Sequence, residues 1–77
     1  MNPLYIQVKK QITESLVNAE WVPGKSIPSE IELANRYKVS QGTVRKAIDD
    51  LVADKILIRM QGKGTFVSTH NEENIQL

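Results

Sequence analysis

The chain has 77 residues, a formal net charge of +1 and an apolar share of 40%. This length allows one small domain with a modest core, and no apolar run approaches the roughly 18 residues that a membrane-spanning helix needs. No secretory signal pattern follows Met1, so we expect a cytoplasmic protein without a membrane partner. The absence of cysteine excludes disulfides and thiolate zinc ligands.

Basic side chains are concentrated in two segments that contain no acidic residue. The first, residues 36–48, holds Arg36, Lys38, Arg45 and Lys46. The second, residues 55–70, holds Lys55, Arg59 and Lys63. Positive segments of this kind suit a polyanion such as nucleic acid, although two ordinary solvated faces would give the same distribution. Charge alone therefore leaves both interpretations open.

Residues 3–19 predict an amphipathic helix. Asn2 is a capping residue, and Pro3 suits the first helical position, where its missing N–H costs nothing. One narrow arc carries the apolar residues Tyr5, Val8, Ile12, Leu16 and Ala19. We expect this arc to face the core. Ile6 and Val17 lie off the arc, either as ordinary surface residues or in contact with a partner subunit or a further domain.

Residues 21–24 predict a turn that ends this helix. We expect Trp21 to pack over the end of the helix. Residues 26–28 can supply only a very short strand, because Pro28 lacks the N–H that a neighbouring strand would bond.

A capping box formed by Ser29 and Glu32 predicts the start of a second helix. Glu30 and Glu32 in its first turn also suit the positive end of the helix dipole. This helix runs to about Tyr37, and only Lys38 and Val39 separate it from the next helix cap. Two short helices joined by so tight a turn form a helix-turn-helix.

The third helix, residues 41–53, has one apolar face and one polar face. Val44, Ala47, Ile48 and Leu51 fall on the apolar face, and Gly42, Arg45, Lys46 and Asp49 on the opposite one. A helix whose exposed face is small at its start and then basic is typical of a recognition helix in the major groove of DNA. Asp49, one turn after Arg45, either orients the guanidinium or marks the end of that face.

Two short segments with β-forming residues, 55–60 and 65–68, flank residues 61–64. Two glycines and a lysine make the intervening residues a hairpin loop, and a hairpin directly after a helix-turn-helix is a wing. The sequence thus predicts an α+β, mostly α fold for residues 1–68: a winged helix-turn-helix of three helices and a small β-hairpin. Residues 69–77 show no periodic or capping signal, and we interpret them as a tail or linker.

Four groups of residues follow one another along the chain. They are Pro3-Leu4-Tyr5-x-Gln7, Pro23-Gly24-x-x-Ile27-Pro28-Ser29-Glu30-x-Glu32-Leu33-Ala34, Val39-Ser40-x-x-Thr43-Val44-Arg45-x-Ala47 and Gln61-Gly62-Lys63-Gly64-Thr65-Phe66-Val67. In this order and spacing they resemble the amino-terminal domain of GntR-family bacterial transcription regulators. The first and last groups are most similar to the HutC-type branch, and the resemblance covers nearly all of residues 3–68.

The resemblance implies a transcription regulator, such as a repressor, that binds palindromic operator DNA as a homodimer. It places the helix at residues 41–53 in the major groove and the wing at 61–64 on the minor groove. The residues that it assigns to DNA binding are Ser40, Gln41, Gly42, Thr43, Arg45, Lys46, Gln61, Gly62, Lys63 and Gly64. It implies no cofactor and no metal. Family members also carry a carboxy-terminal domain that binds a small-molecule effector and holds the dimer together, and we expect residues 69–77 to lead to such a domain.

Three residues depart from the family pattern. Gln41 replaces a frequent arginine, and because glutamine pairs best with adenine we expect a different base preference there. Ile31 also replaces a frequent arginine, which puts a phosphate contact at that position in doubt. Lys55 replaces the usual glycine after the third helix, so a non-glycine residue has to make that turn or the helix has to end differently.

Two other functions remain as alternatives. An enzyme would need a catalytic base, but the single histidine, His70, lies in the presumed tail, and Gly62 to Thr65 lack the spacing of a phosphate-binding loop. We therefore expect that the chain is not an enzyme. A winged-helix module for protein–protein interaction would need a large apolar patch on the exposed face of the third helix, where the sequence has Gly42, Arg45 and Lys46.

Overall fold

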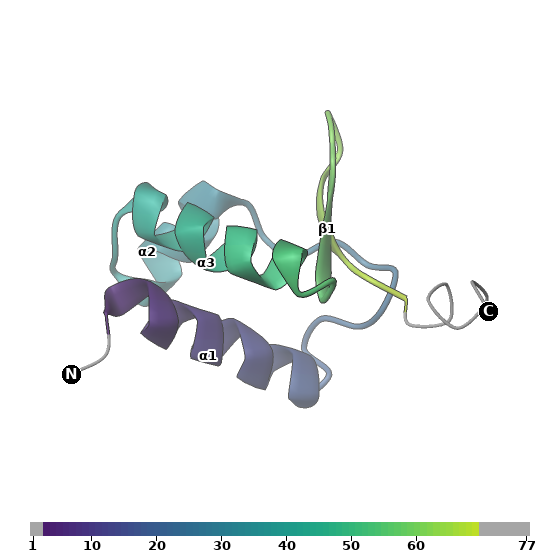
Figure 1. Ribbon diagram of the computed structural model, residues 1–77, viewed down its shortest axis with the longest axis horizontal. Helices are drawn as coiled ribbons and strands as arrows, with labels where there is room; N and C mark the ends of the chain where they lie inside the picture. The colour runs from purple at the N-terminus through teal and green to yellow at the C-terminus, as the bar shows by residue number, and fades with distance from the viewer. Residues whose placement is uncertain (1–2, 70–77) are drawn as a thin grey trace.

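The computed structural model describes residues 3–69, which form three helices and a two-stranded hairpin. The helices are α1 (Leu4–Val17), α2 (Glu30–Tyr37) and α3 (Gln41–Ala53), and the strands are β1 (Leu57–Met60) and β2 (Gly64–Val67). The hairpin projects from the C-terminal end of α3, away from the packed helices (Figure 1). The predicted winged helix-turn-helix is confirmed. The predicted cap at Asn2 and most of the predicted tail lie outside the described residues.

Helix α1 begins and ends differently from the prediction. Pro3 is the N-cap rather than the first helical residue, because its ψ of 153° is extended while its carbonyl already accepts hydrogen bonds from the N–H groups of Ile6 and Gln7. At the other end Ala19 is exposed and has left the helix with a φ of 63°. The N–H of Glu20 bonds back to the carbonyl of Ser15 at 2.8 Å, which closes a Schellman turn. The predicted apolar arc therefore ends at Leu16.

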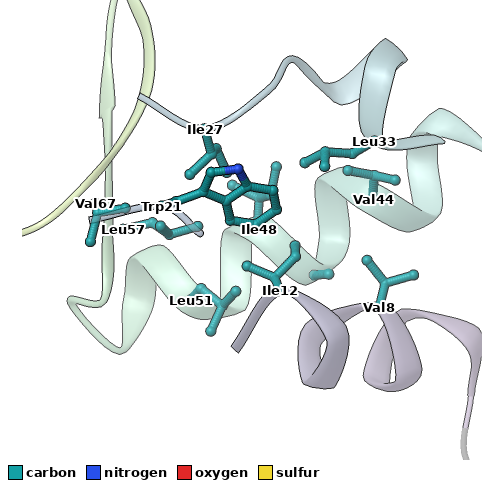
Figure 2. Packing of buried hydrophobic residues seen from close by; sticks show 11 residues of the cluster. Val8, Ile12, Trp21, Ile27, Leu33, Val44, Ile48, Leu51, Leu57 and Val67 are labelled. Atoms are coloured by element: carbon teal, nitrogen blue, oxygen red, sulfur yellow. The ribbon is translucent and has the colours of Figure 1, made fainter. Parts of the chain in front are cut away.

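One core holds the helices and the base of the hairpin together. Its buried residues are Val8, Ile12, Trp21, Ile27, Leu33, Val44, Ala47, Ile48, Leu51, Leu57 and Val67. Figure 2 shows the Trp21 ring inside this cluster, so this side chain belongs to the core rather than only covering the end of α1. Helix α3 contacts α1, α2 and β1, and its four predicted apolar residues are all buried. The core therefore fixes the orientation of α3.

The hairpin is attached to the body on both sides of β2. Its strands are antiparallel, with Leu57 opposite Val67 and Met60 opposite Gly64. On the other edge of β2, a single bridge joins Ser26 to Phe66, and the N–H of Ile27 donates to the carbonyl of Thr65 at 2.9 Å. The very short strand predicted at residues 26–28 is thus reduced to one bridge, and it anchors the base of the wing.

All three helices end with a non-glycine residue in the left-handed backbone region. These residues are Ala19, Lys38 and Lys55, with φ values of 63°, 59° and 65°. After α3, the N–H of Lys55 bonds the carbonyl of Val52 and the N–H of Ile56 bonds that of Leu51, each at 2.9 Å. The turn after α3 is therefore made by a lysine in the conformation that normally favours glycine.

Replacing Lys55 with glycine is expected to raise the free energy of unfolding by about 0.5–1 kcal/mol, because glycine adopts a positive φ without the clash at Cβ. Urea unfolding followed by circular dichroism measures the change. Ala53→Gly is the matched control, since it places the same residue at the last helical position of α3, where φ is not positive, and is expected to lower stability by up to about 1 kcal/mol. A Lys55→Gly protein less stable than the parent would contradict this prediction.

Candidate nucleic-acid interface

The start of α3 is organised by two hydroxyl groups. Ser40, the N-cap, accepts a hydrogen bond from the N–H of Thr43 at 3.1 Å, and the two hydroxyl oxygens are bonded to each other at 2.9 Å. A helix N-terminus presents N–H groups and the positive end of the helix dipole, and this arrangement suits an anion such as phosphate. Ser40 is exposed at the surface, so this end of the helix can be reached by a large partner.

The structure places the predicted residues of α3 on its solvent side. Gln41, Gly42, Arg45 and Lys46 are exposed, and Thr43 is half-buried. A Cβ atom added at Gly42 would meet no other group closer than the Ser40 hydroxyl at 4.0 Å. The first turn of the helix is therefore narrow, and a partner can approach its backbone closely.

Arg45 does not project freely into solvent but is bonded to α2. Its side chain is 59% exposed, and its Nε and Nη2 atoms donate to Oε1 of Glu30 at 3.2 and 3.0 Å. Oε2 of Glu30 accepts a further hydrogen bond from Nη2 of Arg59, on β1, at 3.1 Å. The other end of the Arg59 guanidinium bonds Asp49 of α3. These four residues, which we call the ionic cluster, join both helices of the helix-turn-helix to the wing.

The charges of the ionic cluster keep Glu30 ionised. Burial raises the pKa of the Glu30 carboxyl, but hydrogen bonds from Arg45 and Gln41, with the charges of Arg45 and Arg59, outweigh it and hold the pKa below its ordinary value. The hydrogen bonds to Glu30 in turn raise the pKa of Arg45. With two arginines and two carboxylates, the formal charges of the cluster cancel.

Arg45 and Lys46 lie on opposite flanks of α3. The ammonium group of Lys46 lies 4.7 Å from the centre of the Tyr5 ring on α1, a cation–π contact. Arg45, by contrast, is bonded to α2. The two basic side chains thus border the exposed strip of the helix on both sides.

The tip of the wing is narrow and exposed. Its four predicted residues are Gln61, Gly62, Lys63 and Gly64, all on the surface. The N–H of Lys63 bonds the carbonyl of Met60 at 2.9 Å, and Gly62 and Gly64 have φ values of 77° and 118° with no atom within 4 Å of an added Cβ. Gly64 is the first residue of β2 rather than part of the loop, because it pairs with Met60. This shape suits insertion into a groove.

Sequence reasoning missed the roles of Glu30 and Arg59. Glu30 was assigned only to the helix dipole, and Asp49, expected near Arg45, bonds Arg59 instead. One signal was available: residues two apart in a strand share a face, so Arg59 must lie on the same side as the buried Leu57. A basic residue on the side of a strand that faces the helices can meet acidic side chains of those helices.

Two other kinds of site are absent from residues 3–69. This part of the chain contains no group of three or more His, Cys, Asp or Glu residues that could hold a metal ion. Nor does any helix within it have the length and apolar character to cross a membrane. Ile31, where the family often has arginine, is exposed and presents an apolar side chain at the start of α2.

A helix-turn-helix with a wing and an exposed basic recognition helix defines the class of winged helix-turn-helix DNA-binding domains. The model of the family "Bacterial regulatory proteins, gntR family" matches residues 4–67. The chain therefore belongs to this family, as the resemblance of its sequence motifs implied.

Relatives and solved structures agree with this assignment. The chain is 47% identical over 74 residues to the probable fructoselysine utilization operon transcriptional repressor of Escherichia coli K12, covering 96% of this chain and 30% of that protein. It is 46% identical over 66 residues to the histidine utilization repressor of Pseudomonas putida, covering 86% of this chain and 27% of the relative. The chain thus spans less than a third of these curated relatives.

One group of solved structures contains DNA. The AraR DNA-binding domain in complex with operator ORX1 superposes with a TM-score of 0.84 at 44% identity, covering 88% of this chain and 82% of that one. A GntR-family transcriptional regulator from Listeria monocytogenes shares the fold with a TM-score of 0.87 at 24% identity, covering 97% of this chain and 66% of that one.

Proposed function

We propose that this chain is the operator-reading domain of a bacterial transcription regulator and binds double-stranded DNA sequence-specifically. Helix α3 (residues 41–53) enters the major groove, and the wing tip (61–64) lies at the minor groove. The observation that carries the proposal is the exposed, basic start of α3 on a rigid core, beside a narrow wing. The similarity to an AraR domain in complex with its operator supports it.

Each candidate residue at the start of α3 has a side chain suited to one kind of DNA contact. Ser40 and Thr43 bind phosphate through their hydroxyls and the helix N-terminus. Gln41 and Arg45 read base edges, with glutamine suited to adenine and arginine to guanine. Gly42 leaves room for the groove edge, and Lys46, on the other flank, binds a phosphate.

The wing supplies the second contact. Lys63 is carried at its tip with Gln61 beside it, and Gly62 and Gly64 keep the tip thin enough to follow a minor groove. A winged helix that touches both grooves fixes its orientation on the duplex better than a single helix would.

The whole regulator extends beyond this domain. Residues 1–68 form the DNA-binding domain and residues 69–77 lead into a further domain that binds a small-molecule effector and holds a homodimer. A homodimer reads a palindromic operator, because each recognition helix meets one half-site. The regulator acts as a repressor in the cytoplasm, where bacterial DNA lies, and this domain binds without catalysing a reaction.

Selection of bound duplexes from a random pool tests this proposal. We expect a palindromic consensus, and binding to it that weakens steeply with salt as cations are released from the phosphates. A scrambled duplex of equal length and composition is the control. Absence of any enrichment would overturn the proposal and favour the winged-helix protein-interaction module; affinity that does not change with salt would also contradict it.

A further inference from the structure

Arg59 occupies an unusual place in the wing. It lies two residues after the buried Leu57, on the inward side of β1, and its side chain is 37% exposed. Its guanidinium bonds carboxylates from two different helices, Glu30 of α2 and Asp49 of α3. Through these two ion pairs, Arg59 connects the wing to both helices of the helix-turn-helix.

Glu30 uses its two oxygens for two different arginines. Oε1 accepts from Arg45 and Oε2 from Arg59, and the Glu30 side chain is only 21% exposed. A poorly solvated carboxylate is costly to leave without a cationic partner. It would also repel a nearby phosphate. The hydrogen bond from Arg59 to Glu30 is therefore most important when Arg45 leaves Glu30.

We propose that Arg59 is a positioning residue for DNA binding, which keeps Glu30 neutralised while Arg45 transfers from Glu30 to the DNA. The inference rests on the proposed function, because it takes Arg45 as a DNA contact. Before binding, Glu30 holds Arg45 at the surface of α3 with both nitrogens on one oxygen. After transfer, Oε2 is still bonded to Arg59, so the carboxylate next to the duplex is not left as an unpaired charge.

Two other roles for Arg59 make different predictions. As a direct phosphate contact, it would contribute equally whether or not Glu30 is charged, and its loss would lower the salt dependence by about one counterion. As a purely structural tie, its loss would lower the melting temperature, and DNA affinity would fall with the folded fraction. If Arg59 instead serves to neutralise the Glu30 carboxylate, the effect of losing Arg59 on DNA affinity depends on whether Glu30 is charged.

A double-mutant cycle separates these roles. Affinity for the selected duplex is measured by fluorescence anisotropy, at several salt concentrations, for the parent, Arg59→Gln, Glu30→Gln and the double variant. Arg59→Gln is expected to weaken binding on the order of tenfold when Glu30 is present and less than about twofold in the Glu30→Gln background. Arg59→Lys, which keeps the charge, is expected to restore most of the affinity.

Arg36→Gln is the matched control for the loss of one positive charge. Arg36 is also an ion-paired arginine of α2, but its partner is Glu20 and it stacks over Trp21. We expect less than about a twofold change in affinity, in keeping with a charge outside the ionic cluster. Thermal unfolding of each variant shows whether it is folded at the temperature of the titration.

The outcomes distinguish this inference from the function on which it rests. Equal losses in both Glu30 backgrounds, or no loss in either, would overturn the positioning role while the parent still binds its duplex. Failure of Arg59→Lys to restore affinity would also overturn it, since the charge is then not what matters. A parent protein that prefers no duplex would instead refute the proposed function, and this inference with it.

Discussion

The Arg45→Ala protein is expected to bind the selected duplex about 5- to 150-fold more weakly than the parent, the loss that follows when a bidentate contact to a base is removed. Arg45 stands on the exposed face of α3 and its side chain takes no part in the apolar core. The fold is therefore expected to stay intact, because Glu30 keeps its hydrogen bond from Arg59 and the Arg45 side chain that is lost is mostly exposed. Anisotropy titrations with selected and scrambled duplexes measure the effect.

The comparison between duplexes decides what Arg45 contacts. If it reads a base, the loss is larger on the selected duplex than on the scrambled one, and selectivity falls. Lys46→Ala is the neighbouring control. In the proposed complex Lys46 contacts a phosphate, so its loss is expected to weaken binding to the selected and the scrambled duplex by a similar, small factor. Equal losses for Arg45→Ala on every duplex would show that Arg45 is itself a phosphate contact.

Ile48→Ala is expected to lower the free energy of unfolding by about 2–5 kcal/mol. Ile48 lies on the inner face of α3 and is 0% exposed in the middle of the core, so the smaller side chain leaves a cavity that the surrounding elements cannot fill. A domain of this size has only roughly 4–12 kcal/mol of stability. Urea unfolding measures the loss, and DNA binding is expected to fail near the lowered melting temperature.

Val17→Ala is the control for this substitution. Val17 is 79% exposed on α1, so removing its methyl groups is expected to change stability by less than about 0.5 kcal/mol. An Ile48→Ala protein that unfolds at the same urea concentration as the parent would show that the inner face of α3 is not part of a tightly packed core.

The helix-turn-helix could be predicted from local signals, because each of its boundaries is set by nearby residues. Ser29 bonds the N–H of Glu32 and Ser40 bonds that of Thr43, as a capping residue three positions before its partner should. The buried face of α3 followed from helical periodicity alone. The C-terminal end of helix α1 was predicted two residues too late because Ala19 continues the periodic arc, and periodicity does not reveal a Schellman turn.

The ionic cluster could not be predicted in the same way. Glu30 and Arg59 are 29 residues apart, and they meet only because the core brings the start of α2 against the wing. The local pattern placed Glu30 at the positive end of the α2 dipole, which is compatible with the structure. It gave no sign of the hydrogen bonds from Arg45 and Arg59. DNA contact by the candidate residues between Ser40 and Lys46 and between Gln61 and Gly64 stays a prediction, which the duplex experiments test.

Trp21 gives this domain an optical reporter of its own. It is the single tryptophan of the chain, it is buried in the core, and the Arg36 guanidinium lies 5.2 Å from its ring centre. Its fluorescence therefore reports on the packing of the core, while a fluorophore on the duplex reports on binding. The two signals can be recorded from one cuvette, so every substitution at the DNA-facing surface can be separated into its effect on folding and its effect on recognition.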